Sequence, residues 1–178
     1  LQYRRAESAY RSFVYRNYLQ VPESVTQLLG QYWDETTAGY GSRENLTLPQ
    51  AQACTLTFLS RCFPEEGTPE DMELPLTAAE GTSFQYATVA VMTLRYFGIP
   101  ARYAEGYVIS EEMAADAQAD EPLTVDSRCA RAWAEVYQDG IGWIPMELTP
   151  GLGEMLEQKP EENPDEGCLL YTSDAADD

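Results

Sequence analysis

The sequence contains no histidine among its 178 residues. Histidine is the side chain whose unperturbed pKa lies closest to neutral pH, and it is the usual general base in nucleophilic enzymes. No residue of this chain has an ordinary pKa suited to that role. A mixed zinc site would also lack its imidazole, and no two of the four cysteines have the C-x-x-C spacing. We therefore expect no metal and no cofactor.

Basic residues are scarce as well. The chain has 11 Lys and Arg against 30 Asp and Glu, which gives a formal net charge of −19. Neutralising phosphates requires clusters of Lys and Arg, so this charge argues against nucleic acid and against anionic membrane surfaces as partners. No apolar run approaches the ~20 residues that cross a bilayer. Because the chain begins at Leu1 without Met or a signal peptide, we expect a piece of a longer protein that does not itself insert into a membrane.

One cysteine, Cys168, lies in a C-terminal segment of unusual origin. Residues 168–178 look like one reading frame of a transposon-end adapter used in sequencing libraries. We interpret them as an assembly artefact in a metagenomic sequence and exclude them from reasoning about the fold.

The other cysteines are Cys54, Cys62 and Cys129. Cys54 and Cys62 are eight residues apart on one predicted helix, roughly 12 Å along its axis, too far for a disulfide while the helix is intact. Each is predicted to be a small buried apolar residue.

The hydrophobic content of 44% fits one globular domain with a sizeable core. A helix is predicted over residues 6–19, ending before Val21-Pro22, and a second from Pro49 to near Pro64. The acidic stretch that follows is predicted to be a loop. The chain is divided into an N-terminal helical part, a core, an acidic linker and the adapter-like tail, at residues 1–80, 81–155, 156–167 and 168–178.

A third helix is predicted from Ser83 to Phe97. Thr82 and Gln85 form a Thr-x-x-Gln capping box at its start, and Gly98 ends it. Ser83 would therefore lie at a helix N-terminus, where backbone N–H groups and the helix dipole favour negative charge.

Three strands are predicted after this helix, at residues 101–110, 132–137 and 143–148. They would form an antiparallel sheet packed on the Ser83 helix, an α+β fold. Residues 111–127 are rich in Glu, Asp and Ala, with little to bury, and are predicted to be a mobile loop overhanging the site.

Several segments together resemble the core of the transglutaminase-like family, a branch of the papain-like cysteine enzymes. They occur in the family's order and spacing, at Gly81–Ala87, Leu94–Tyr107, Ala130–Tyr137 and Gly142–Pro150. The resemblance implies a papain-like α+β core in which the helix bearing the nucleophile packs on an antiparallel sheet, preceded by helices. A weaker match at Phe13–Pro22 resembles large bacterial membrane-anchored members. It implies a parent protein that displays this domain on the extracytoplasmic face of a bacterial membrane.

By this resemblance, Ser83, Arg131 and Glu147 occupy the positions of the catalytic Cys, His and Asp or Glu. A serine hydroxyl needs a base with a pKa near 7 to lose its proton. Arg131 stays protonated and offers donors only, while a Glu with an ordinary pKa of about 4.3 is too weak a base. We predict that Arg131 and Glu147 form an ion pair where the family has its His–carboxylate pair.

Four residues around these positions are candidates for substrate binding: Gln85, Tyr86, Cys129 and Trp133. Trp133 would flank the cleft by its place in the motif, and Cys129 would point the same way as Arg131 on a strand. Packing in the core is the competing interpretation for Cys129 and for the aromatic residues. Trp143 is expected to pack under the sheet. Glu135 could pair with Arg102 or with Arg131.

Three functions remain open from the sequence. The first is a catalytically inactive pseudoenzyme that binds a peptide, a protein or cell-wall amide ligands in the old cleft. The second is residual amidase, protease or transglutaminase activity through Ser83, with a base supplied from elsewhere. The third is a structural domain of a larger membrane protein, which a filled cleft would favour.

Overall fold

A computed structural model describes residues 2–36, 39–63, 82–115, 117–118 and 121–149. The chain divides into two compact units, Leu1–Gly106 with Arg131–Pro150, and Tyr107–Ala130 with Gly151–Asp178. The helices and the sheet that surround Ser83 belong to the first unit. The predicted loop after Pro64, the boundary at residue 80, the linker and the adapter-like tail all lie outside the described residues.

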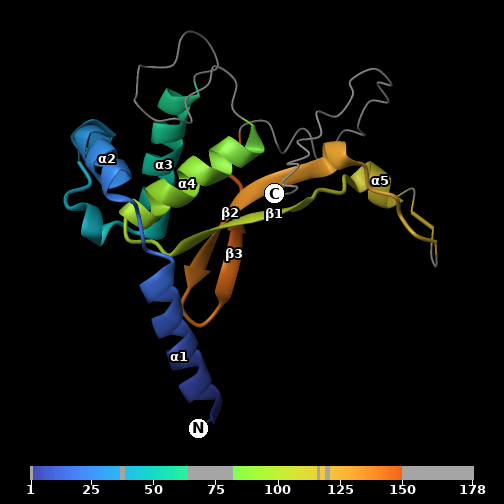
Figure 1. Ribbon diagram of the computed structural model, residues 1–178, viewed down its shortest axis with the longest axis horizontal. Coiled ribbons are helices and arrows are strands. Elements are labelled where there is room, and N and C mark those ends of the chain that lie inside the picture. Colours follow the sequence, from blue (N-terminus) through green and yellow to red (C-terminus); the bar gives the residue numbers. More distant parts are fainter. Residues whose placement is uncertain (1, 37–38, 64–81, 116, 119–120, 150–178) are drawn as a thin grey trace, which may run out of the picture. The chain divides into compact units, whose positions relative to one another are not determined.

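Among the described residues, three α-helices precede the Ser83 helix (Figure 1): α1 (Gln2–Asn17), α2 (Glu23–Thr36) and α3 (Leu48–Cys62), with a short 3₁₀ helix, η1 (Arg43–Asn45). Of these, α1 and α3 are predicted from the sequence and α2 is not. The signal for α2 was present, because Val25, Leu29 and Trp33 recur every four residues, and these residues belong to or pack against the core.

The helix that bears Ser83 is α4 (Ser83–Tyr96), within one residue of the prediction. Both bonds of the capping box form. The Thr82 N–H donates to Gln85 Oε1 at 2.8 Å, and the Gln85 N–H donates to Thr82 Oγ1 at 3.4 Å. At the other end Gly98 has φ +78° and its N–H donates to the Arg95 carbonyl at 3.0 Å, which stops the helix.

The sheet has three strands in the order β1 (Ala101–Tyr107), β2 (Ala130–Gln138) and β3 (Gly142–Met146). β2 and β3 are antiparallel, and Ala134 pairs with Met146. The Tyr137 N–H donates to the Pro100 carbonyl at 2.9 Å, which sets the antiparallel register of β1 on β2. The predicted α+β fold with an antiparallel sheet is therefore confirmed, and β2 is its central strand.

The two faces of this sheet pack against different helices. Alternate residues of the hairpin, Val136 and Met146 among them, join the core cluster with α3 and α4. Tyr137 and Trp143 point to the other face, toward α1, where Trp143 Nε1 donates to the Tyr10 hydroxyl at 2.7 Å. Trp143 thus packs against the sheet, as expected.

The prediction that residues 111–127 form a loop is wrong at both ends of this segment. A five-residue helix, α5 (Glu111–Ala115), forms at its start, and a 3₁₀ helix, η2 (Ser127–Cys129), begins at its last residue. The buried Ser110 explains α5, since its Oγ accepts a hydrogen bond from the Met113 N–H at 3.2 Å and its carbonyl accepts one from the Ala114 N–H.

Cys54 and Cys62 lie on α3 as free, buried thiols, which confirms the prediction. Burial raises the pKa of the Cys62 thiol to about 12.

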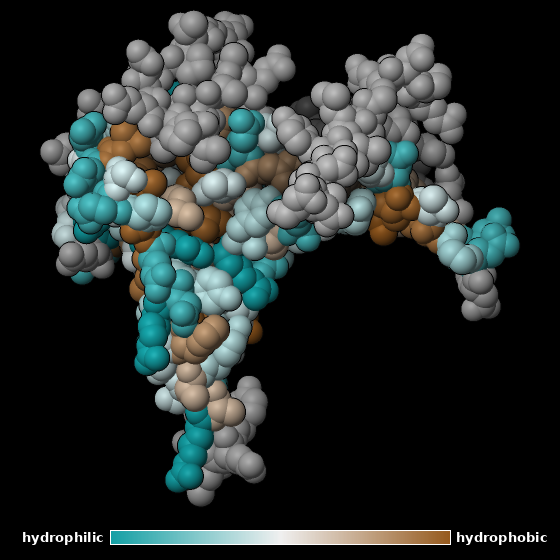
Figure 2. Space-filling view, in the orientation of Figure 1, coloured by the Kyte–Doolittle hydropathy of each residue, from teal (hydrophilic) through white to brown (hydrophobic). Residues whose placement is uncertain are grey.

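The helices in the described part of the chain are all too short or too polar to cross a bilayer. Figure 2 shows this for α1, whose surface carries hydrophilic as well as hydrophobic residues.

Leu94 tests how far the fold depends on α4, because its side chain is 0% exposed in the core. We expect Leu94→Ala to lower the free energy of unfolding by roughly 2–5 kcal/mol. Leu56→Ala, at a position that is 43% exposed, should cost less than about 1 kcal/mol. Urea unfolding followed by circular dichroism measures both, and equal costs for the two variants would contradict this packing.

Candidate active site

Ser83 is the first residue of α4, and its hydroxyl touches the strand that follows the predicted loop. Ser83 Oγ accepts a hydrogen bond from the backbone N–H of Ala132 at 3.3 Å. The fold therefore brings the nucleophile position next to position 131 across 49 residues of sequence.

The Ala132 N–H is available because β3 is short. Along β2, the N–H groups of Ala134, Val136 and Gln138 face β3, and the next residue in that alternation is Ala132. Its partner in the same register would be Leu148, but β3 ends at Met146. The Ser83 hydroxyl occupies the place of the missing strand partner, and such a bond contributes about 1 kcal/mol.

Arg131 is half-buried and alternates with Ala132, so it shares a face of β2 with Trp133 and Glu135. Continuing the β2–β3 register by one residue places Glu147 opposite Trp133 and diagonal to Arg131. The exposed Glu147 carboxylate accepts a hydrogen bond from the Thr149 N–H at 2.6 Å. An ion pair between Arg131 and Glu147 stays a prediction.

Glu135 pairs with Arg102, which decides between the two partners left open by the sequence. The two residues lie directly opposite each other on β2 and β1, and Arg102 Nε lies 2.5 Å from Glu135 Oε2. The same guanidinium lies over the Trp143 ring, 4.4 Å from its centroid. This pair connects the face that bears Arg131 to the aromatic residues beside α1.

Trp133 packs across Gly106, a residue that was not among the predicted site residues. A Cβ at Gly106 would lie 2.7 Å from Trp133 Cη2, so only glycine fits beneath this ring. The sequence does carry a signal for this close contact, because Gly106 lies inside a predicted strand, where glycine often marks the close approach of another group. Trp133 Nε1 is buried and has no hydrogen-bond partner among the described residues. An unpaired buried donor of this kind costs about 1–3 kcal/mol.

The other candidates for substrate binding have structural contacts. The side-chain oxygen of Gln85 caps α4, and Tyr86 is buried with its ring centroid 4.5 Å from that of Phe63. Cys129 belongs to the second unit, where it is buried and its carbonyl accepts a hydrogen bond from the Val108 N–H. Contact of these residues with a substrate stays a prediction. Within the described ranges, no three acidic or cysteine side chains gather as a metal site would require.

A helix N-terminus packed on the end of a central antiparallel strand defines a papain-like α+β domain. The particular family follows from the sequence of that core. Residues 54–148 match the transglutaminase-like superfamily, and the chain belongs to this family.

Two known proteins are similar to this chain. The uncharacterized protein YebA of Bacillus subtilis is 30% identical over 82 residues, which are 46% of this chain and 11% of YebA. The crystal structure of the periplasmic domain of TgpA from Pseudomonas aeruginosa bound to ethylmercury aligns with a TM-score of 0.53 and 25% identity, over 83% of this chain and 52% of that one. The chain thus spans about a tenth of YebA and about half of the TgpA domain.

The contact between Gly106 and Trp133 can be tested with two glycine variants. We expect Gly106→Ala to destabilise the fold by about 1–3 kcal/mol, because the ring must move. Gly30→Ala on α2 is the control: its Cβ would meet only the Tyr96 hydroxyl, at 3.7 Å, and alanine should stabilise the helix by about 0.5–1 kcal/mol. Urea unfolding gives both values, and a neutral Gly106→Ala would contradict the contact.

Proposed function

We propose that this domain is a catalytically inactive member of its family that binds peptide or cell-wall amide ligands without turning them over. The observation that carries the proposal is the setting of the Ser83 hydroxyl. Its oxygen accepts a hydrogen bond from the Ala132 N–H, and the residue at the position of the family's histidine is Arg131, a guanidinium. Both groups are donors, whereas activation of a serine requires a proton acceptor.

Glu147 is a poor substitute for the missing base. Its carboxylate is exposed and already accepts a hydrogen bond from the Thr149 N–H. A carboxylate is in any case a much weaker base than the imidazole that activates a serine hydroxyl. Residual turnover would therefore need a base from another chain or from another part of the parent protein.

Amide ligands suit the groups that remain. The N-terminus of α4 and the buried Trp133 Nε1 are hydrogen-bond donors, and an amide offers a carbonyl oxygen as acceptor. A buried donor without a partner calls for an explanation, and a ligand that completes it is one.

The comparisons also support a location for the domain. The TgpA domain is periplasmic, and 83% of the present chain aligns with it. That similarity supports a location on the extracytoplasmic side of a bacterial membrane. That the domain is part of a longer, membrane-anchored protein stays a prediction. A periplasmic setting would give it access to peptidoglycan stem peptides.

The first test measures amide hydrolysis, amine incorporation and binding on glutamine peptides and peptidoglycan stem peptides. We expect no turnover by the natural sequence or by Ser83→Ala, together with saturable binding of one ligand class. Trp133→Phe keeps an aromatic ring and removes the N–H, and should weaken that binding about tenfold if Nε1 donates to the ligand. Turnover that Ser83→Ala abolishes would establish a base and overturn the proposal. Absence of any binding would favour a structural domain.

A double reversion tests whether the lost chemistry is confined to two residues. We expect Ser83→Cys with Arg131→His to fold and to gain a reactive thiol, because the helix N-terminus and an imidazolium both favour the thiolate. In a Cys168→Ser background, iodoacetamide should alkylate the introduced thiol at pH 6 at least about tenfold faster than an unactivated cysteine of pKa about 8.5. The three native thiols that remain, Cys54, Cys62 and Cys129, give little background because all are buried, and burial also raises the pKa of Cys54 and of Cys62.

The single variant Ser83→Cys is the control, because it introduces the thiol without a proton acceptor. Amide hydrolysis should stay absent in the single variant and become measurable in the double variant. If the introduced thiol reacted like an ordinary cysteine in the folded double variant, more than these two residues would have been lost.

A further inference from the structure

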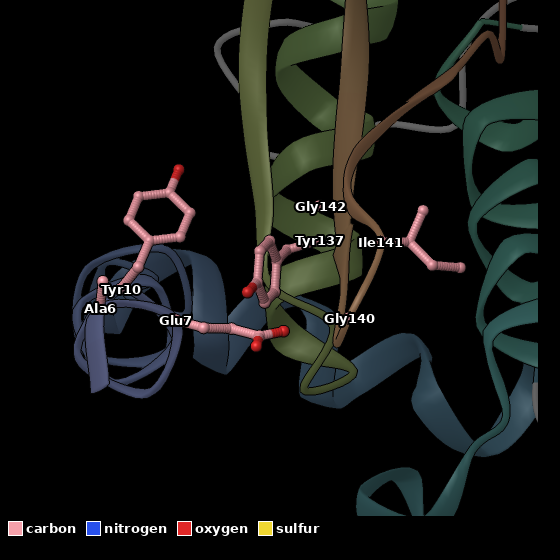
Figure 3. A pocket seen from close by; sticks show the side chains of 7 residues that line it. All are labelled: Ala6, Glu7, Tyr10, Tyr137, Gly140, Ile141 and Gly142. Carbon is pink, nitrogen blue, oxygen red and sulfur yellow. The ribbon is translucent and has the colours of Figure 1, made fainter. Parts of the chain in front are cut away.

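A pocket of about 310 Å³ lies at the end of β2 opposite Ser83 (Figure 3). The residues that line it come from α1, from β2, from the turn before β3 and from the first residue of β3: Ala6, Glu7, Tyr10, Tyr137, Gly140, Ile141 and Gly142. Tyr137 is five residues along β2 from Ala132, roughly 17 Å at the rise of a strand. The pocket is therefore separate from the candidate active site.

Two tyrosine rings form rigid walls of this pocket. Tyr10 and Tyr137 meet edge to face with their centroids 5.9 Å apart. The Tyr10 hydroxyl accepts the hydrogen bond from Trp143 Nε1, and the Trp143 ring packs on Tyr137 with centroids 5.5 Å apart. Because these contacts hold both rings, the aromatic walls exist before any ligand enters.

Glu7 adds a negative charge to the wall of the pocket. Its half-buried carboxylate extends toward Tyr137 in Figure 3, and among the described residues it makes neither a hydrogen bond nor an ion pair. Arg11, one helical turn further along α1, is paired with Asp139 at 2.8 Å. The pKa of Tyr137 reports the local potential: burial raises it, and the carboxylates of Asp139 and Glu7 raise it further.

We propose that the pocket formed by Glu7, Tyr10 and Tyr137 binds an alkylammonium group, such as the side chain of a lysine in a peptide. Aromatic faces attract cations, and the half-buried Glu7 carboxylate supplies the counter-charge. The glycines at 140 and 142 leave room for the alkyl chain, and the acidic chain as a whole attracts a cationic ligand.

The test uses Nα-acetyl-lysine N-methylamide as the cationic probe and its Nε-acetylated form as the neutral twin. Both are titrated into the full-length chain while the backbone amides of Gly140, Ile141 and Gly142 are followed by ¹H–¹⁵N NMR. We expect saturable shifts at these three amides with the cation and none with the neutral twin. A parallel titration with n-butylamine shows whether the pocket recognises a free alkylammonium ion or a lysine side chain within a peptide. Equal affinity means that the pocket recognises the free cation, and tighter binding of the lysine derivative means that it also recognises peptide.

Two variants locate the interaction. Glu7→Gln should weaken binding of the cationic probe at least about tenfold, whereas Glu23→Gln, which removes the same charge from α2, should change it less than about twofold. Ala6→Leu fills the pocket from α1 and should also abolish binding while Glu7 stays charged. Unchanged affinity in folded Glu7→Gln and Ala6→Leu variants would overturn the proposal. So would equal binding of the neutral twin, or shifts spread over the acidic surface without saturation.

Discussion

Burial of α4 between α3 and the sheet is the constraint on which the rest of the first unit depends. Ala90, Val91 and Leu94 are almost wholly buried along this helix, so its axis cannot shift without opening the core. The capping box then sets where the helix begins. Ser83 is held at the end of β2 as a consequence, whatever side chain stands at position 83.

Under the proposed function, this independence of fold and site explains how a fold of this family persists without the reactive side chains. The core cluster, the capping box and the pair between Arg102 and Glu135 involve neither Ser83 nor Arg131. Serine at position 83 is also useful to the structure, because its oxygen bonds an N–H that the short β3 strand leaves unpaired. We therefore expect a substitution at position 83 or 131 to cost the fold little stability.

The central strand separates two chemically different ends. Near Ala132 the available groups are donors, namely backbone N–H groups, the start of a helix and a buried indole. Near Tyr137 they are aromatic faces and carboxylates beside α1. Trp143 and Arg102 lie between these regions and tie the hairpin to α1 and to β1. A ligand that spans β2 would meet hydrogen-bond donors at one end, and carboxylates and aromatic rings at the other.

Local sequence patterns determined most of the elements. The capping box at Thr82, the glycine after α4 and the alternation along the strands act within a few residues of the chain, so they can be read without the fold. The omission of α2 and of α5 shows the limit of that approach. The apolar residues of α2 recur every four residues, whereas α5 starts at the buried Ser110 in a polar stretch with little apolar pattern.

Only the tertiary structure decided the contacts that depend on strand register. Arg102 and Arg131 were equal candidates to pair with Glu135, and the pairing of β1 with β2 selects Arg102. The same register places Gly106 beneath the Trp133 ring and leaves the Ala132 N–H for Ser83. The sequence by itself determined which residues stand at the reactive positions and that no histidine is among them. Which groups face them is set by long-range pairing, since a shift of one residue would turn every side chain of a strand to the other face.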